Sequence, residues 1–216
     1  MGRNSGGGGN GYAQAGTKPI GVNSNGKVIG SAAAAQIIDN AESISKLPDR
    51  EVVKQLQRGI SRYEKVMGLR ERTIMIAPID GAYGVTFLSS DGSQGIYLSK
   101  QAFSGKRHDV EGRYRRENYD TGFKNLTNRP IQHTITHELA HATWTSSYTG
   151  ARQVAAGKEI RDLYHHWSRD KGKSGYGRYG ASNVDEFWAE VVTKAIHGNP
   201  DRYTRRAVAI AKKYKL

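Results

Sequence analysis

Hydrophobic residues recur at helical spacing in several segments of the chain. The clearest pattern follows Leu47, where one helical face collects Val52, Val53, Leu56, Ile60, Tyr63, Val66 and Met67. Similar patterns cover 31–47, 151–170, 184–197 and 201–214. Another helix is expected to begin at Pro130 and to continue to about Thr145, because proline is favoured in the first helical turn. These periods predict a chain rich in helices.

Three shorter segments have the composition of strands, namely 73–79, 85–89 and 95–99. The sequences DGAYG and DGSQG separate them, and Asp-Gly pairs are typical of tight turns. We therefore expect a small antiparallel sheet built as a three-stranded meander. Because 95–99 is the last strand before the helix that starts at Pro130, we expect it to be the sheet edge. An extended peptide could add to such an edge as a further strand.

Two segments of the chain show neither the helical nor the strand pattern of hydrophobic residues. Residues 1–30 are rich in Gly, Ser and Asn and predict a flexible tail. Residues 104–128 are polar and basic, and no regular element is expected there. The sequence thus predicts one α+β domain over 31–216, preceded by the tail.

Composition restricts the kinds of site that this domain can hold. The 216 residues include no Cys, so a metal ion would have to be bound by His and carboxylate side chains. No apolar run follows a basic start, and no apolar stretch reaches 18 residues. We therefore expect neither a signal peptide nor a membrane span.

The chain carries a formal net charge of +13. Its basic residues concentrate at 106–116, 169–178 and 202–215, which could favour an anionic partner or nucleic acid. The simpler interpretation is a basic, solvated surface. No motif of a nucleic-acid-binding domain accompanies these segments.

The stretch ITHELAHATW, residues 135–144, holds the most specific chemical signal. Residues four apart share a helical face, so His137 and His141 can both face one ion. Glu138 lies beside that ion rather than on it. This is the HExxH pattern of zinc peptidases, in which the glutamate activates the zinc-bound water.

Zinc also needs a third protein ligand, and the stretch NVDEFWAEVV, residues 183–192, offers one. Glu186 and Glu190 are again four apart on a helix. Glu186 could bind the ion while Glu190 holds the far nitrogen of a liganding histidine. Asn183 could cap this helix, with Glu186 completing a capping box. The alternative is an amphipathic helix whose acidic residues face solvent.

The sequences THELAH and YGASNVDEFWAE, residues 136–141 and 179–190, together resemble the anthrax toxin lethal factor-type metallopeptidases. These are gluzincins related to the Pro-Pro endopeptidases, and they also occur in phage-associated proteins. The resemblance covers roughly 130–200, about a third of the chain. It implies a zincin-like fold and Zn²⁺ as the cofactor.

By position, the resemblance implies that His137, His141 and Glu186 are zinc ligands and that Glu138 is the catalytic base. It also implies that Glu190 supports a ligand and that Tyr179 supplies a hydroxyl to the transition state. Tyr176, three residues earlier, is the rival for that role.

Other polar residues are interpreted as outside the ion's reach. His133 continues the face of His137 but is too distant from His141 to share an ion, so it is expected at the surface or beside a ligand. His165 and His166 are expected to be ordinary helical residues, and His197 a cation at a helix end. Asp185 could compete with Glu186, but it is rotated by about 100°.

The expected function is a zinc-dependent endopeptidase acting on a protein or peptide, with the location open between a phage virion and a host cytoplasm. One alternative is a DNA-associated protease that uses its positive charge to dock on nucleic acid. The other is a non-catalytic phage structural or effector protein with a vestigial site.

Overall fold

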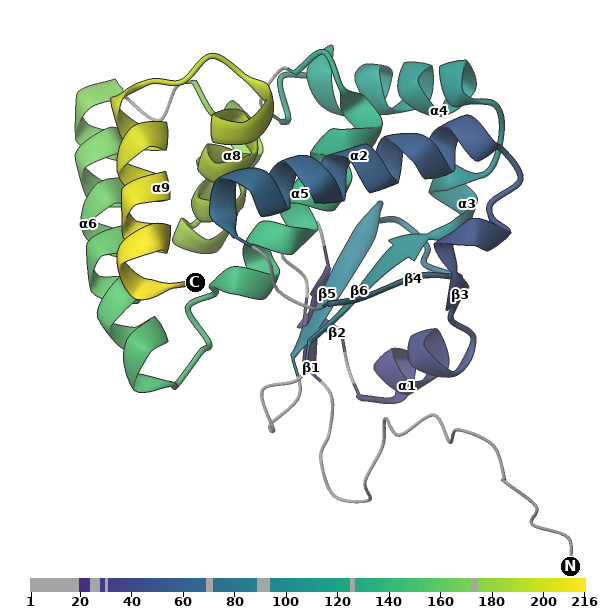
Figure 1. Ribbon diagram of the computed structural model, residues 1–216, viewed down its shortest axis with the longest axis horizontal. Coiled ribbons are helices and arrows are strands. Elements are labelled where there is room, and N and C mark those ends of the chain that lie inside the picture. The colour runs from purple at the N-terminus through teal and green to yellow at the C-terminus, as the bar shows by residue number, and fades with distance from the viewer. Residues whose placement is uncertain are drawn as a thin grey trace, which may run out of the picture.

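The computed structural model describes residues 20–23, 28–29, 31–68, 72–88, 94–124, 127–171 and 175–216. Its elements combine helices with one mixed sheet, which confirms the α+β class (Figure 1). The helices, including one 3-10 helix (η1) and one π-helix (η2), are α1 (Ser31–Asp39), η1 (Ile44–Lys46), α2 (Arg50–Met67), α3 (Lys100–Phe103), α4 (Arg107–Tyr114), η2 (Arg115–Tyr119), α5 (Pro130–Thr143), α6 (Ala151–Lys171), α7 (Gly177–Gly180), α8 (Val184–His197) and α9 (Arg202–Tyr214).

The sheet has the strand order β2-β1-β5-β6-β4-β3. Its strands are β1 (Ile20–Asn23), β2 (Val28–Ile29), β3 (Glu42–Ser43), β4 (Thr73–Ala77), β5 (Gly84–Leu88) and β6 (Gln94–Ser99). The pair β4–β6 is parallel, and every other neighbouring pair is antiparallel. The sheet is therefore mixed.

The predicted antiparallel meander is wrong in its strand order. The three strand segments exist, but β6 lies between β5 and β4, and β4 runs parallel to it. On the helix-facing side, β4 and β6 present Ile76, Ile96 and Leu98 to the main core, whereas β5 presents Gly84 and Thr86. Placing β4 beside β6 thus groups the bulky apolar side chains under the helices.

The same order corrects the predicted edge strand. Residues 95–99 belong to β6, which is paired on both sides and has no free edge. The strand nearest the predicted site is β5, whose other neighbour is β1. Two stretches of the predicted tail, β1 and β2, therefore belong to the sheet, while residues 1–19, 24–27 and 30 lie outside the described part.

Apolar residues fill both faces of the sheet. The larger core lies between the sheet and the helices, with α2 and α5 crossing above the strands (Figure 1). A smaller core covers the opposite face, where Ala34 and Ile37 of α1 pack with Val85, Phe87 and Tyr97. Because successive side chains of a strand point to opposite faces, this double coverage explains why Ile96, Tyr97 and Leu98 of β6 are all large and apolar.

Most of the predicted helices occur close to their expected bounds, but one predicted helix is divided and one helical segment was not predicted. The pattern over 31–47 divides into α1, β3 and η1. The polar segment 104–128 contains α4 and η2, where Val110 and Tyr114 are the buried apolar residues of α4. Two such positions are too few to produce a clear helical period. Within the described residues, no helix is long and apolar enough to cross a membrane.

Candidate metal centre

Helix α5 occupies the middle of the molecule. It packs against α2, α8, β5 and β6 (Figure 1), and all 14 of its residues are buried. Its polar side chains include His133, His137, Glu138 and His141. Because buried polar groups need partners, these four residues identify the region where the neighbouring elements must supply hydrogen bonds or an ion.

Three ligand atoms converge between α5 and α8. His137 Nε2 lies 3.1 Å from His141 Nε2, and each of these nitrogens lies 3.2 Å from Glu186 Oε2. Ligands that each lie 2.0–2.1 Å from a tetrahedral ion are about 3.3–3.4 Å apart. The donor atoms, two imidazole nitrogens and a carboxylate oxygen, therefore fit a single metal ion, and this group could hold one.

The start of α8 directs Glu186 to the histidines. Asn183 caps the helix, and its Oδ1 accepts a hydrogen bond from the Glu186 backbone N–H at 2.9 Å. The predicted capping box is only half formed, because the Glu186 carboxylate faces His137 and His141 instead of the cap. Asp185 points away and accepts hydrogen bonds from the backbone and hydroxyl of Ser146.

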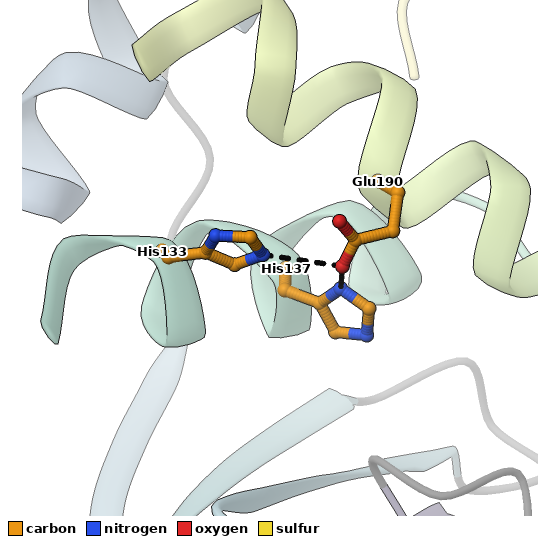
Figure 2. Close-up of side chains that lie close together, drawn as sticks. All are labelled: His133, His137 and Glu190. Carbon is orange, nitrogen blue, oxygen red and sulfur yellow. Dashed lines mark hydrogen bonds and ion pairs between the residues drawn. The ribbon is translucent and has the colours of Figure 1, made fainter. Parts of the chain in front are cut away.

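One turn further along α8, Glu190 contacts the other side of His137. Its Oε1 lies 3.0 Å from His137 Nδ1, and both side chains are fully buried (Figure 2). A proton on Nδ1 satisfies this contact and leaves the Nε2 lone pair facing Glu186 and His141. Glu190 thereby selects the histidine tautomer that can bind a metal.

Charges within the centre are mutually compensating. Burial alone raises the pKa of Glu186, but the nearby His141 and His137 outweigh it and hold that pKa well below its usual range. Burial acts to lower the pKa of His141, yet Glu186 raises it overall. The three groups therefore favour a positive charge between them, which a dication can supply.

Glu138 lies on the sheet side of α5. Its Oε2 accepts a hydrogen bond from Thr86 Oγ1 at 2.9 Å, and its Oε1 is buried without a hydrogen-bond partner among the described residues. Gly84 leaves room for the carboxylate, since a Cβ there would lie 3.0 Å from Oε1. One carboxylate oxygen is thus held and the other is available.

The two candidate tyrosines have different surroundings. The Tyr179 ring stacks against His137 with 5.6 Å between centroids, and burial together with the charge of Glu186 raises its pKa. The Tyr176 hydroxyl instead donates to Asp201 at 2.9 Å. Of these two tyrosines, Tyr179 is therefore the one whose ring lies against a proposed metal ligand, His137.

The structure selects one of the two expectations for His133 and corrects the expectation for His197. His133 does not lie at the surface but beside the residue that contacts the proposed ligand His137: it is fully buried, and its Nε2 lies 3.1 Å from Glu190 Oε1 (Figure 2). His197 is not a solvated cation, because burial lowers its pKa to about 3. Both residues lie on faces that the packing of α5 and α8 covers, which local sequence patterns do not reveal.

Comparisons of the chain with protein-family models, with curated proteins and with solved structures found no match.

Proposed function

We propose that the protein is a zinc-dependent endopeptidase with a zincin-like catalytic domain. The observation that carries this proposal is the convergence of His137 Nε2, His141 Nε2 and Glu186 Oε2 within 3.2 Å of one another. Two nitrogens and one oxygen are a donor set that suits zinc and leaves a fourth position for water. Glu138 follows the first histidine directly, as HExxH chemistry requires.

Zinc at this position would activate a water molecule and polarise the scissile carbonyl. Glu138 then accepts the proton of the attacking water and passes it to the leaving amine. Its buried position beside Thr86 supports this role, because one oxygen is anchored while Oε1 remains available.

Tyr179 would donate a hydrogen bond to the developing oxyanion, a role that its stacking against His137 supports. The ordinary pKa of a tyrosine is about 10, so its phenol is protonated at neutral pH, as a donor must be. Glu190 orients His137 throughout the reaction and does not contact the substrate.

The first test measures zinc per chain by plasma mass spectrometry on protein purified without a metal-affinity tag. We expect about one zinc in the wild type. Glu186→Gln should lose most of it, whereas Asp185→Asn, the adjacent carboxylate that faces Ser146, should retain it. A wild type that takes up no zinc after reconstitution would reject the metal site.

The second test asks whether the site cuts peptides, with a peptide library as substrate. Glu138→Gln should retain zinc and lose cleavage, by about 100-fold or more for a general base. Tyr179→Phe should lower kcat, while Tyr176→Phe should leave kcat unchanged. Zinc binding without cleavage by the wild type would favour the non-catalytic binding protein, and cleavage that requires added DNA would favour the DNA-associated protease.

A further inference from the structure

His133 lies on the side of Glu190 that faces away from the candidate metal position. It precedes His137 by one helical turn on α5, and Figure 2 shows both rings directed at the same carboxylate of α8. The distances to Glu190 Oε1 are 3.1 Å from His133 Nε2 and 3.0 Å from His137 Nδ1. All three side chains are fully buried, so water does not replace these contacts.

The direction of these hydrogen bonds follows from the atoms involved. A single carboxylate oxygen can satisfy two ring nitrogens only by accepting a proton from each. His133 therefore donates through Nε2, and in the neutral ring its Nδ1 is an acceptor.

The outer contacts of His133 fit this assignment. Its Nδ1 lies 3.0 Å from the hydroxyl of Tyr119, which in turn lies 2.8 Å from Thr127 Oγ1. Tyr119 must then donate to His133 and accept from Thr127. Hydrogen bonds in such a buried chain strengthen one another and fix the ring orientations.

We propose that His133 is a positioning residue for the metal centre, which anchors Glu190 so that Glu190 holds His137 in its metal-binding tautomer. Thr127 donates to Tyr119, Tyr119 to His133, and His133 to Glu190. His137 also donates to Glu190, through Nδ1, and its Nε2 faces the proposed metal position. Without the His133 hydrogen bond, Glu190 loses one of the donors that hold Oε1 and gains rotational freedom.

A second metal ion between His133, His137 and Glu190 is the alternative use of this group, since these atoms are also close enough for one. Hydrogen bonds are favoured here, because a neutral imidazole offers a lone pair on only one of its two nitrogens. A metal there would also require the Nδ1 lone pair of His137, while its Nε2 faces Glu186 and His141.

This inference rests on the proposed metal site but not on peptidase activity, so its test measures metal binding. Zinc affinity is determined by competition with a chromophoric chelator for the wild type, His133→Leu, His133→Gln and Tyr119→Phe. Loss of a partner behind a metal ligand weakens binding by about 10–100-fold, and we expect about tenfold for His133→Leu. His133→Gln, whose amide can still donate to Glu190, should restore affinity to within about threefold.

The visible spectrum of the cobalt(II)-substituted protein reports the ligand geometry separately from overall stability. We expect it to change in His133→Leu and to return towards that of the wild type in His133→Gln. Equal affinity and equal spectra in all four proteins would overturn the inference. Two metals per wild-type chain, with one lost in His133→Leu, would overturn it in favour of the second metal ion.

The two proposals fail in different ways. A wild type that binds no zinc removes the metal site itself. A wild type that binds zinc, with affinity insensitive to His133, removes only the positioning role. If His133→Leu does not fold, His133→Phe takes its place, because phenylalanine is aromatic and of similar size but cannot donate to Glu190, and it should bind zinc about tenfold more weakly than His133→Gln. Tyr119→Phe keeps the hydrogen bond to Glu190 and should bind zinc nearly as the wild type does.

Discussion

Gly84 of β5 lies against the side chain of Glu138, and this contact controls where the proposed base can sit. A Cβ at position 84 would approach Glu138 Cγ to 2.9 Å and Oε1 to 3.0 Å. Any larger residue would therefore push the carboxylate away from its position. The hydrogen bond from Thr86 holds the same side chain at Oε2, so β5 both shapes and anchors the base.

Gly84→Ala should consequently lower peptide cleavage without removing zinc. A displacement of about 1 Å at a reacting group can cost about 100-fold in rate, and we expect a loss of that order. The matched control is Gly112→Ala, because a Cβ there would meet only the end of the Arg116 side chain at 3.4 Å. Full activity in Gly84→Ala would show that Glu138 does not need its present position.

The grouping of the proposed ligands was predictable from the sequence, because their spacing along each helix is local. His137, Glu138, His141 and Glu186 follow from spacing on two helices, and the structure brings the three proposed ligands together. For His133 the sequence left the surface and a position beside a ligand open, because its partners Glu190 and Tyr119 come from other elements. Its helical phase shows only that it shares a face with His137, not that this face is buried.

Helix α9 depends on a cap that also joins two other segments. Asp201 accepts hydrogen bonds from the backbone N–H groups of Tyr203 and Thr204, and a capping box completes the turn. The same carboxylate accepts from the Tyr176 hydroxyl and from Lys194 Nζ. One side chain thus connects α9, α8 and the segment before α7.

Asp201→Ala should lower the free energy of unfolding by about 1–2 kcal/mol, the usual cost of losing a cap. Thermal unfolding should show this as a fall of about 2–4 °C for each kcal/mol. Burial alone raises the pKa of Asp201, but the Thr204 backbone N–H, Lys194 and Tyr176 hold it below the usual 3.8. Its contribution is therefore present above pH 3.8 and is lost as the pH falls through the lower folded value.

The difference between the wild type and Asp201→Ala should accordingly shrink under acidic conditions. Asp201→Asn provides the matched control, since an amide can still cap the helix but carries no charge for Lys194. A stability difference that is the same at pH 7 and below pH 3 would contradict the assignment of the charged cap.

The helices and strands themselves were predicted better than which of them lie side by side. The longer helices with a clear apolar period or a first-turn proline were found, whereas α4, with Val110 and Tyr114 buried, was not. The segments of β4, β5 and β6 were found, but β1, β2 and β3 were not, and neither was the strand order. Alternation of side chains identifies a strand and its two faces, and it does not say which strand lies beside it.

Across the whole molecule, part of the positive charge is used in packing the C-terminal helices. Arg202 of α9 pairs with Asp170 of α6, and Arg206 and Lys213 both pair with Glu159. These ion pairs lie where α6 and α9 pack together (Figure 1). The basic segment 202–215 therefore has partners within the chain, which weakens its use as evidence for nucleic-acid binding.

The position of β1 leads to a prediction about access to the proposed site. Its residues pair antiparallel with β5, with Val22 opposite Thr86 and Gly21 opposite Phe87. Thr86 in turn contacts Glu138, so β1 occupies the side of β5 to which an extended peptide could otherwise add as a strand near the proposed site. A segment of the same chain has a high effective concentration and competes with a free peptide.

Replacing Gly21 and Val22 together by proline should weaken β1, because adjacent N–H groups face β2 and β5 in turn and proline removes both. If β1 competes with substrate, the double variant should lower KM for an extended peptide by at least about threefold, with zinc content and kcat unchanged. A synthetic peptide with the sequence of residues 17–29 should then inhibit the variant more strongly than the wild type. An unchanged or higher KM would mean that β1 supports the sheet without blocking the peptide, and that substrate reaches Glu138 from another side.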